Sequence, residues 1–206
     1  MQGVSAWELI NDALTFHQNN LRKNELITLF NAAGLPKIWS DIEKANAIEK
    51  YLKRADAGES IEQIIVEFVD FRNDAAHGRP DQILGTDALR QRIDFVEAFC
   101  HAISDAVTRH IVCEQVNSHP ETVIGTVAET YRGNVIVATC ERGSLEVGQC
   151  LYFLRNADCR KATVESLQID GVEKTSVEIF DEITEVGIRT SVRVKKKSQL
   201  VTVLDP

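Results

Sequence analysis

Several features that mark other classes of protein are missing from this sequence of 206 residues. No apolar run approaches the roughly 18 residues of a membrane-spanning helix, so we expect no membrane contact. The N-terminal stretch MQGVSAWELIND is polar and acidic, unlike a secretory signal peptide. The five cysteines are odd in number and show no Cys-x-x-Cys spacing, which argues against a disulfide framework and a zinc site. We therefore expect a cytoplasmic protein with free thiols, no metal and no other cofactor.

Positive charge is also scarce. The 23 Lys+Arg stand against 31 Asp+Glu, and the net charge of -8 argues against a protein that coats nucleic acid nonspecifically. Residues 1–117 hold 12 basic and 18 acidic side chains, and residues 118–206 hold 11 and 13. The negative net charge does not exclude a small, local phosphate-binding site. The one basic run, Lys195 to Lys197, is most simply interpreted as a solvated hairpin turn.

The period of the apolar residues changes near residues 117–120. Before this point the spacing is helical, and after it apolar and polar residues alternate in segments rich in Val, Ile and Thr. The chain is long enough for two small domains, each with its own core. We therefore predict a multi-domain α + β protein, with an all-α helical bundle over residues 1–117 and a small β-barrel over residues 121–206.

Five helices are expected in the bundle. Ser40 with Glu43, and Ser60 with Gln63, have the spacing of capping boxes that begin the third and fourth helices. Glycine and proline residues end several of the segments. The expected ranges are Ala6–Asn19, Lys23–Ala33, Ser40 to just before Gly58, Ser60–His77 and Asp87–Val116.

Apolar residues on the long fifth helix repeat at helical spacing and predict its packing stripe. We expect Trp7 and Trp39 to be packing residues as well. The remaining histidines are scattered and have no paired spacing with carboxylates or cysteines. The stripe comprises Leu89, Ile93, Val96, Phe99, Ile103, Ala106 and Val107.

Short alternating segments separated by turn residues predict six or seven strands in the second part. Their spacing is typical of a small closed or nearly closed barrel. The expected strands are Thr122–Tyr131, Asn134–Glu141, Gln149–Leu154, Arg160–Ile169, Thr175–Ile179, Gly187–Val194 and Gln199–Leu204.

The fourth helix carries an arginine where an apolar residue is expected. With about 100° per residue and Ile61 at zero, Ile65 lies near about 40°, Phe68 near about -20° and Ala75 near about -40°. Arg72 lies near about 20°, in the middle of this stripe. An unpaired buried guanidinium costs several kcal/mol, roughly, so a partner is required. Either Arg72 forms an ion pair inside its own subunit, or the stripe faces a second surface that needs a cation.

Two further polar residues accompany this arginine. Asn73 and His77 are four residues apart and therefore face the same way on a helix. His77 alone is compatible with a simple C-terminal histidine stabilised by the helix dipole beside Gly78. A planar cation, an amide and a titratable imidazole together are suited to the cleavage of a phosphodiester.

The stretch RNDAAHG, residues 72–78, resembles the Arg-polar-…-His signature of the HEPN superfamily, in the form found in its RNase-L-like branch. The resemblance covers roughly residues 1–116. It implies metal-independent cleavage of RNA by a homodimer, in which the motifs of two protomers face one cleft. In that case Arg72 would hold the scissile phosphate, Asn73 would orient the phosphate or the imidazole, and His77 would assist the proton transfer.

The second part resembles domain 2 of translational GTPases such as elongation factor Tu. The stretch GTVAETYRGNVIVATCERGSLEVGQCLYFL carries a Gly-x-Val strand and a Gly-x-Leu-x-x-Gly turn at Gly143, Leu145 and Gly148. The chain contains no P-loop, so nucleotide hydrolysis is not implied. RNA docking by the barrel is an analogy at the level of fold, and a protein-binding or spacer barrel is the alternative.

Two classes of function follow. The first is an endoribonuclease that cuts single-stranded RNA, as a toxin or defence effector, with an antitoxin or another protein as partner. The second is a non-catalytic module in which the bundle dimerises and the barrel recruits a partner or RNA. The low positive charge favours the second, and the intact set of Arg72, Asn73 and His77 favours the first.

Overall fold

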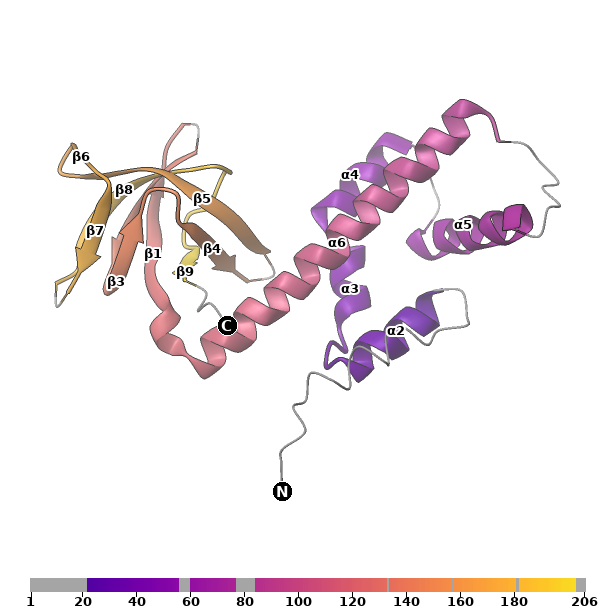
Figure 1. The fold of residues 1–206 in the computed structure, drawn as a ribbon, viewed down its shortest axis with the longest axis horizontal. Coiled ribbons are helices and arrows are strands. Elements are labelled where there is room, and N and C mark those ends of the chain that lie inside the picture. Colours follow the sequence, from indigo (N-terminus) through magenta and orange to yellow (C-terminus); the bar gives the residue numbers. More distant parts are fainter. Residues whose placement is uncertain are drawn as a thin grey trace, which may run out of the picture. The chain divides into compact units, whose positions relative to one another are not determined.

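The computed structural model describes residues 22–55, 60–76, 84–132, 134–156, 158–180 and 182–202. The chain divides into two compact units, Met1–Val107 and Thr108–Pro206. Helices make up the first unit and strands most of the second (Figure 1). The expected helix Ala6–Asn19 and Trp7 lie outside the described residues. Within the described ranges, no helix combines the length and apolar character of a membrane span.

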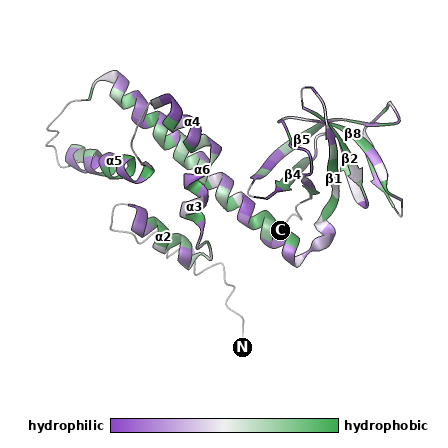
Figure 2. Cartoon of the chain, turned by 180° about the vertical axis from the view of Figure 1, so that it is seen from behind, coloured by the Kyte–Doolittle hydropathy of each residue, from purple (hydrophilic) through white to green (hydrophobic). Residues whose placement is uncertain are grey.

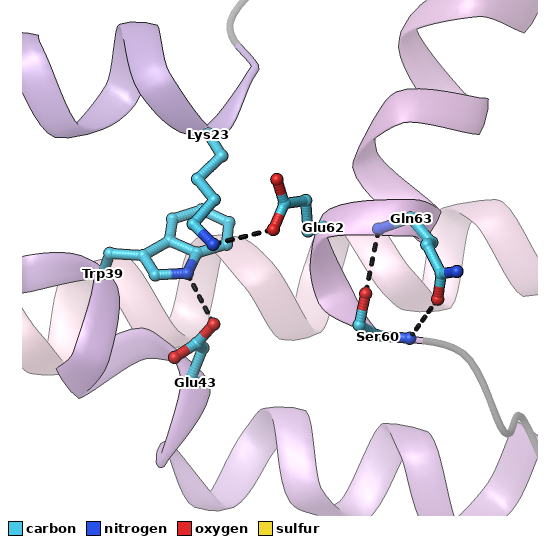
Figure 3. A network of polar contacts seen from close by, with 6 residues as sticks. All are labelled: Lys23, Trp39, Glu43, Ser60, Glu62 and Gln63. Atoms are coloured by element: carbon cyan, nitrogen blue, oxygen red, sulfur yellow. Dashed lines mark hydrogen bonds and ion pairs between the residues drawn. The ribbon is translucent and has the colours of Figure 1, made fainter.

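Among the described residues, the first α-helix is α2 and the last is the 33-residue helix α6. The predictions for α2, α5 and α6 are confirmed to within two residues at each end. At the start of α5 the Ser60 N–H donates to Gln63 Oε1 over 2.8 Å, and the Gln63 N–H donates to Ser60 Oγ over 3.3 Å, so the predicted capping box is present (Figure 3). The helices are α2 (Lys23–Ala32), α3 (Ile38–Glu43), α4 (Asn46–Ala55), α5 (Ile61–Ala76) and α6 (Thr86–Ser118).

The prediction of one helix starting at Ser40 is wrong. Two helices, α3 and α4, replace it, and the break falls at residues 44–45. Ser40 lies inside α3, where its Oγ accepts a hydrogen bond from Lys44 Nζ over 3.0 Å. Asn46 begins α4, in keeping with the preference of asparagine for helix starts. The break lets α3 and α4 each bury an isoleucine, Ile42 and Ile48, at 0% exposure.

A single cluster of buried residues holds the helices together. Three aromatic pairs contribute to it: Trp39 with Phe99, Tyr51 with Phe95, and Phe95 with Phe99, with ring centroids 6.4, 5.4 and 5.7 Å apart. The predicted packing role of Trp39 is confirmed. The fully buried members are Leu26, Ile38, Trp39, Ile42, Ile48, Ile61, Ile64, Ile65, Val69, Phe95, Ala102 and Ala106.

The strands form a closed six-stranded antiparallel barrel, in the order β4-β9-β1-β2-β8-β5, with β4 pairing with β5 to close it. The predicted barrel is confirmed, but β3 and β6 fall in segments that were interpreted as turns or left unassigned. Strand β8 begins three residues earlier than expected. The strands are β1 (Val123–Thr130), β2 (Val135–Cys140), β3 (Gly143–Glu146), β4 (Cys150–Arg155), β5 (Asp158–Ile169), β6 (Val172–Lys174), β7 (Ser176–Ile179), β8 (Thr184–Thr190) and β9 (Gln199–Val201).

The barrel interior is filled by alternate residues of its strands, and hydrophobic residues run along β1 in Figure 2. Phe153, Leu151 and Ile188 are among the largest side chains that are fully buried there. Gly125 marks a close approach of two backbones, because a Cβ at this position would overlap the Thr139 carbonyl oxygen and lie 2.8 Å from the Cys140 Cα. A glycine is therefore required at this point of the pairing between β1 and β2.

Candidate functional site

Helix α5 positions the first two residues of the predicted site. Its first half is anchored in the core by Ile61, Ile64, Ile65 and Val69. Arg72 and Asn73 follow in the last two turns; the Arg72 side chain is exposed and Asn73 is half-buried. The third predicted residue, His77, lies outside the described residues, and so does Gly78.

The expectation that the buried stripe continues through Arg72 is wrong for the single chain. Phe68 is half-buried, Val69 is 6% exposed, and both Arg72 and Ala75 are exposed. The burial ends with Val69 because the last turns of α5 extend beyond the core. The alternative in which Arg72 is buried deep inside its own subunit is therefore wrong too. The Arg72 side chain as a whole is exposed.

Helix α6 supports this end of α5. The Arg92 guanidinium of α6 lies over the Phe71 ring, with Cζ 5.0 Å from the ring centroid. The Arg92 Nε atom is buried and has no hydrogen-bond partner among the described residues, so the aromatic face is its nearest compensation. This contact holds the residue next to Arg72 against the first third of α6.

Ion pairs tie α5 to the start of α2. Arg22 Nη2 lies 2.6 Å from Asp70 Oδ1, and Lys23 Nζ lies 2.7 Å from Glu62 Oε2. The hydrogen bond to Glu62 raises the pKa of Lys23, whose Nζ also lies 5.4 Å from the centroid of the Trp39 ring (Figure 3). Arg72 is the only basic residue of α5, which also carries four acidic residues. The Arg72 side chain is thus exposed on a helix whose other charged residues are all acidic.

An exposed apolar seam runs along the first half of α6. Leu89, Ile93 and Val96 are 48%, 59% and 36% exposed, and Cys100 is exposed as well. The sequence analysis assigned the first three to a packing stripe, and that expectation fails within the single chain. The core face of α6 is instead formed by Phe95, Ala102 and Ala106, which lie roughly 130° away around the helix at about 100° per residue. We call Leu89, Ile93, Val96 and Cys100 the α6 seam.

A groove of about 610 Å³ lies between α4 and α6 and was missed by the sequence analysis. Lys50 and Arg54 line its α4 side. Asp94, Glu97, His101 and Asp105 line the α6 side, and the His101 Nε2 atom lies 3.9 Å from Glu97 Oε1. The spacing of 94, 97, 101 and 105 places these four on one helix face and was the available signal. Arg72 and Asn73 do not line this groove.

The histidines, cysteines and carboxylates of the described part of the chain form no group of three or more that could hold a metal ion. None of the five cysteines forms a disulfide bond. Burial raises the pKa of the Cys140 thiol to about 11, so this thiol stays protonated at neutral pH.

Two solved structures and one family model are similar to parts of this chain. Two crystal structures of the C-terminal domain of Geobacillus thermoleovorans putative U32 peptidase, one of them the selenomethionine variant, are 11% and 10% identical. Each covers 39% of this chain, with TM-scores of 0.34 and 0.35, and 98% and 91% of the respective domain is covered. No curated protein matches the chain. The model of the RiboL-PSP-HEPN family matches residues 3–109, which is more than half of the sequence and includes Arg72, Asn73 and His77. This chain belongs to the RiboL-PSP-HEPN family.

Proposed function

We propose that this protein is a metal-independent endoribonuclease that cuts single-stranded RNA at a site built by two copies of the chain. The observation that carries the proposal is the exposed Arg72 beside Asn73, on the last turns of α5 and inside the region that matches the family. A planar guanidinium at the surface suits bidentate binding of a phosphate. None of the five cysteines forms a disulfide bond, which fits a reducing cytoplasm.

In the proposed reaction, Arg72 binds the scissile phosphate and stabilises the charge that grows on it. Asn73 orients the phosphate or the imidazole. His77 assists the transfer of the proton from the ribose 2′-OH, whose oxygen forms a bond to phosphorus as the bond to the 5′-oxygen breaks. The products are a 2′,3′-cyclic phosphate and a 5′-hydroxyl, which takes up a proton. An ordinary imidazole titrates near ~6.5, which suits this task at neutral pH.

The α6 seam supports the two-copy arrangement. Its spacing of four, three and four residues is that of a coiled-coil seam. In an antiparallel pair of α6 helices with a twofold axis between Ile93 and Val96, Ile93 of each copy packs on Val96 of the other. The same register places Arg90 of each copy opposite Glu97 of the other, so the charges beside the seam are self-complementary.

This pairing also bears on the position of Arg72. Arg92 flanks the seam on the side where Phe71 of α5 packs. In an antiparallel pair the equivalent flanks of both helices face the same side. The two Arg92 residues would be five residues apart along the helices, about 7 to 8 Å at ~1.5 Å per residue. The ends of both α5 helices would then lie on the same face of the helix pair, related by the twofold axis between them, as a shared site requires.

The second candidate is a non-catalytic interaction module. The observation that favours it is the acidic character of the helical part, with 12 basic and 18 acidic residues in residues 1–117. Such a surface repels the RNA backbone and suits a basic protein partner. In this case the bundle would dimerise and the barrel would recruit the partner. The proposed ribonuclease, by contrast, would act as a toxin or defence effector restrained by an antitoxin or another protein.

The deciding experiment measures cleavage of an unstructured 30-nucleotide RNA by the full chain in excess EDTA. We expect products that end in 2′,3′-cyclic phosphate, and a loss of about two to four orders of magnitude in rate for Arg72→Ala and His77→Ala. Arg142→Ala, an exposed arginine of the barrel, is the matched control and should cleave normally. Activity that survives His77→Ala, or that needs a divalent ion, would contradict the assignment. Intact RNA together with tight protein binding would favour the module.

A further inference from the structure

Positively charged side chains are concentrated at one end of the barrel. Strand β8 ends at Thr190. This end lies beside the β1–β2 turn, because the Thr190 N–H donates to Asn134 O. It also lies along the first half of β5, because the Ser191 N–H donates to Thr163 O. The β4–β5 turn and residues 191–198 lie at this same end. Residues 131–134, 155–160 and 191–198 hold seven of the 11 Lys+Arg of residues 118–206 and one of the 13 Asp+Glu, Asp158. We call this the basic end: Arg132, Arg155, Arg160, Arg193, Lys195, Lys196 and Lys197.

The three lysines stand on a tightly held turn. Lys197 adopts a left-handed conformation with φ 66°, which is unfavourable for a residue with a side chain. The turn is kept in place by Ser198, which is 3% exposed and whose Oγ donates to Lys195 O over 2.8 Å. Two backbone bonds to β1 also fix it: Lys197 N–H to Val127 O, 2.9 Å, and Val127 N–H to Ser198 O, 2.8 Å. The charges are therefore displayed on a preorganised backbone.

One carboxylate from each neighbouring hairpin contacts this turn. Glu129, near the end of β1, lies 2.6 Å from Lys196 Nζ. Asp158, at the start of β5, lies 2.8 Å from Lys195 Nζ and 3.3 Å from Arg160 Nε. Burial pushes the pKa of Asp158 up, but Lys195 and Arg160 outweigh it and hold the pKa below its usual value. Two acids against seven cations leave a clear excess of positive charge.

An exposed aromatic ring accompanies the cations. Tyr131 is 59% exposed and follows Glu129 by two residues, which places both on the same face of an extended chain. A second tyrosine, Tyr152 on β4, has Lys161 Nζ 6.0 Å from its ring centroid. A positive surface with aromatic rings is the combination that single-stranded nucleic acids bind, through their phosphates and by base stacking. An acidic protein segment would use the cations and would have no need of an accessible ring.

We propose that the basic end of the barrel binds the sugar–phosphate backbone of single-stranded RNA, with Tyr131 stacking on a base. The choice of RNA rests on the proposed function, but the surface lies wholly within the barrel and is separate from Arg72. The lysine turn and Arg193 neutralise successive phosphates, and the exposed ion pair between Lys196 and Glu129 is weak enough to exchange for them. The barrel thereby supplies the affinity for a polyanion that the acidic helical part lacks.

The test is the affinity of the full chain for a fluorescein-labelled, unstructured 15-nucleotide RNA, measured by anisotropy between 50 and 300 mM salt in the His77→Ala background. Replacing all three lysines (Lys195→Gln, Lys196→Gln, Lys197→Gln) should weaken binding at least tenfold. It should also reduce the slope of log K against log salt by about 2, since each contact with a single strand contributes roughly 0.7. Tyr131→Leu should weaken binding without changing the slope. Lys174→Gln, an exposed lysine on β6, is the matched control and should leave both quantities unchanged.

A second variant distinguishes the loss of charge from misfolding. Lys197→Gly removes one charge at a position whose φ favours glycine, so it should fold at least as well and lose a slope of roughly 0.7. Unchanged affinity and slope in these variants, or equally tight binding of a poly-glutamate of the same length, would overturn the proposal. Wild-type protein that binds RNA in this way without cleaving it would refute the ribonuclease assignment alone.

Discussion

Dimerisation through the α6 seam can be tested with a single substitution, Ile93→Ala. Ile93 is 59% exposed in the single chain, so a partner could still bury rather more than half of its side chain. Full burial of an isoleucine contributes about 1.5 to 3 kcal/mol, so this fraction corresponds to roughly 1 to 2 kcal/mol per copy. The residue occurs twice in a symmetric dimer. After allowance for the Cβ that alanine keeps, we expect a loss of about 2 to 3 kcal/mol.

That loss corresponds to a dimer dissociation constant about 30 to 150 times higher. Sedimentation velocity of the full chain over a dilution series measures this constant directly. Val172→Ala is the control, because Val172 is 57% exposed on β6 and lies outside the seam. Alanine is the best helix former, so Ile93→Ala should not destabilise α6 itself.

Charge reversal beside the α6 seam tests the register in which the two α6 helices pair. Arg90→Glu or Glu97→Arg alone puts like charges opposite each other at both ends of the pair, and each should weaken the dimer. The two changes together restore opposite charges and should recover most of the affinity. A wild type that stays monomeric at high concentration, or an Ile93→Ala variant that dimerises like Val172→Ala, would refute the reasoning.

Two further predictions concern the barrel. Gly125→Ala should destabilise it by about 1 to 3 kcal/mol in urea unfolding, because the added Cβ meets the backbone of β2. Gly187→Ala, whose Cβ would lie 3.5 Å from the Gln168 Cβ, should change the stability little, and equal effects of the two would contradict this explanation. At pH 8 the Cys140 thiol, with its pKa raised to about 11, should resist iodoacetamide in the native state while the exposed Cys150 reacts, as mass spectrometry would detect.

Local patterns predicted much of the fold. The Ser60–Gln63 box starts α5, and the alternating segments after residue 120 form the barrel strands. The patterns failed where a segment was short or its ends depended on distant contacts. Strand β3, Gly143–Glu146, is paired with β7 more than 30 residues away, so nothing local distinguished it from a turn. The break between α3 and α4 allows both Ile42 and Ile48 to pack into the same core, which is a tertiary contact and not a local pattern.

The predicted site was recognised from residue types alone, but its setting was not. A helical wheel places Arg72 on an apolar stripe and cannot show where the core ends. The structure places that end at Val69, so Arg72 is exposed. The same limit applies to α6, where the wheel gave Leu89, Ile93 and Val96 the role of core residues. Their exposure is decided by which face of α6 the other helices cover.

The sequence by itself determined that helices come first and strands follow, that the change falls near residue 120, and that Arg72, Asn73 and His77 occur in one short segment. These properties follow from hydrophobic periodicity and residue chemistry, which are local. Only the tertiary structure decided which apolar residues stay exposed on α6 and which cations gather at one end of the barrel. Both depend on burial and on contacts between residues far apart in the chain, because a side chain's exposure is set by its neighbours in space.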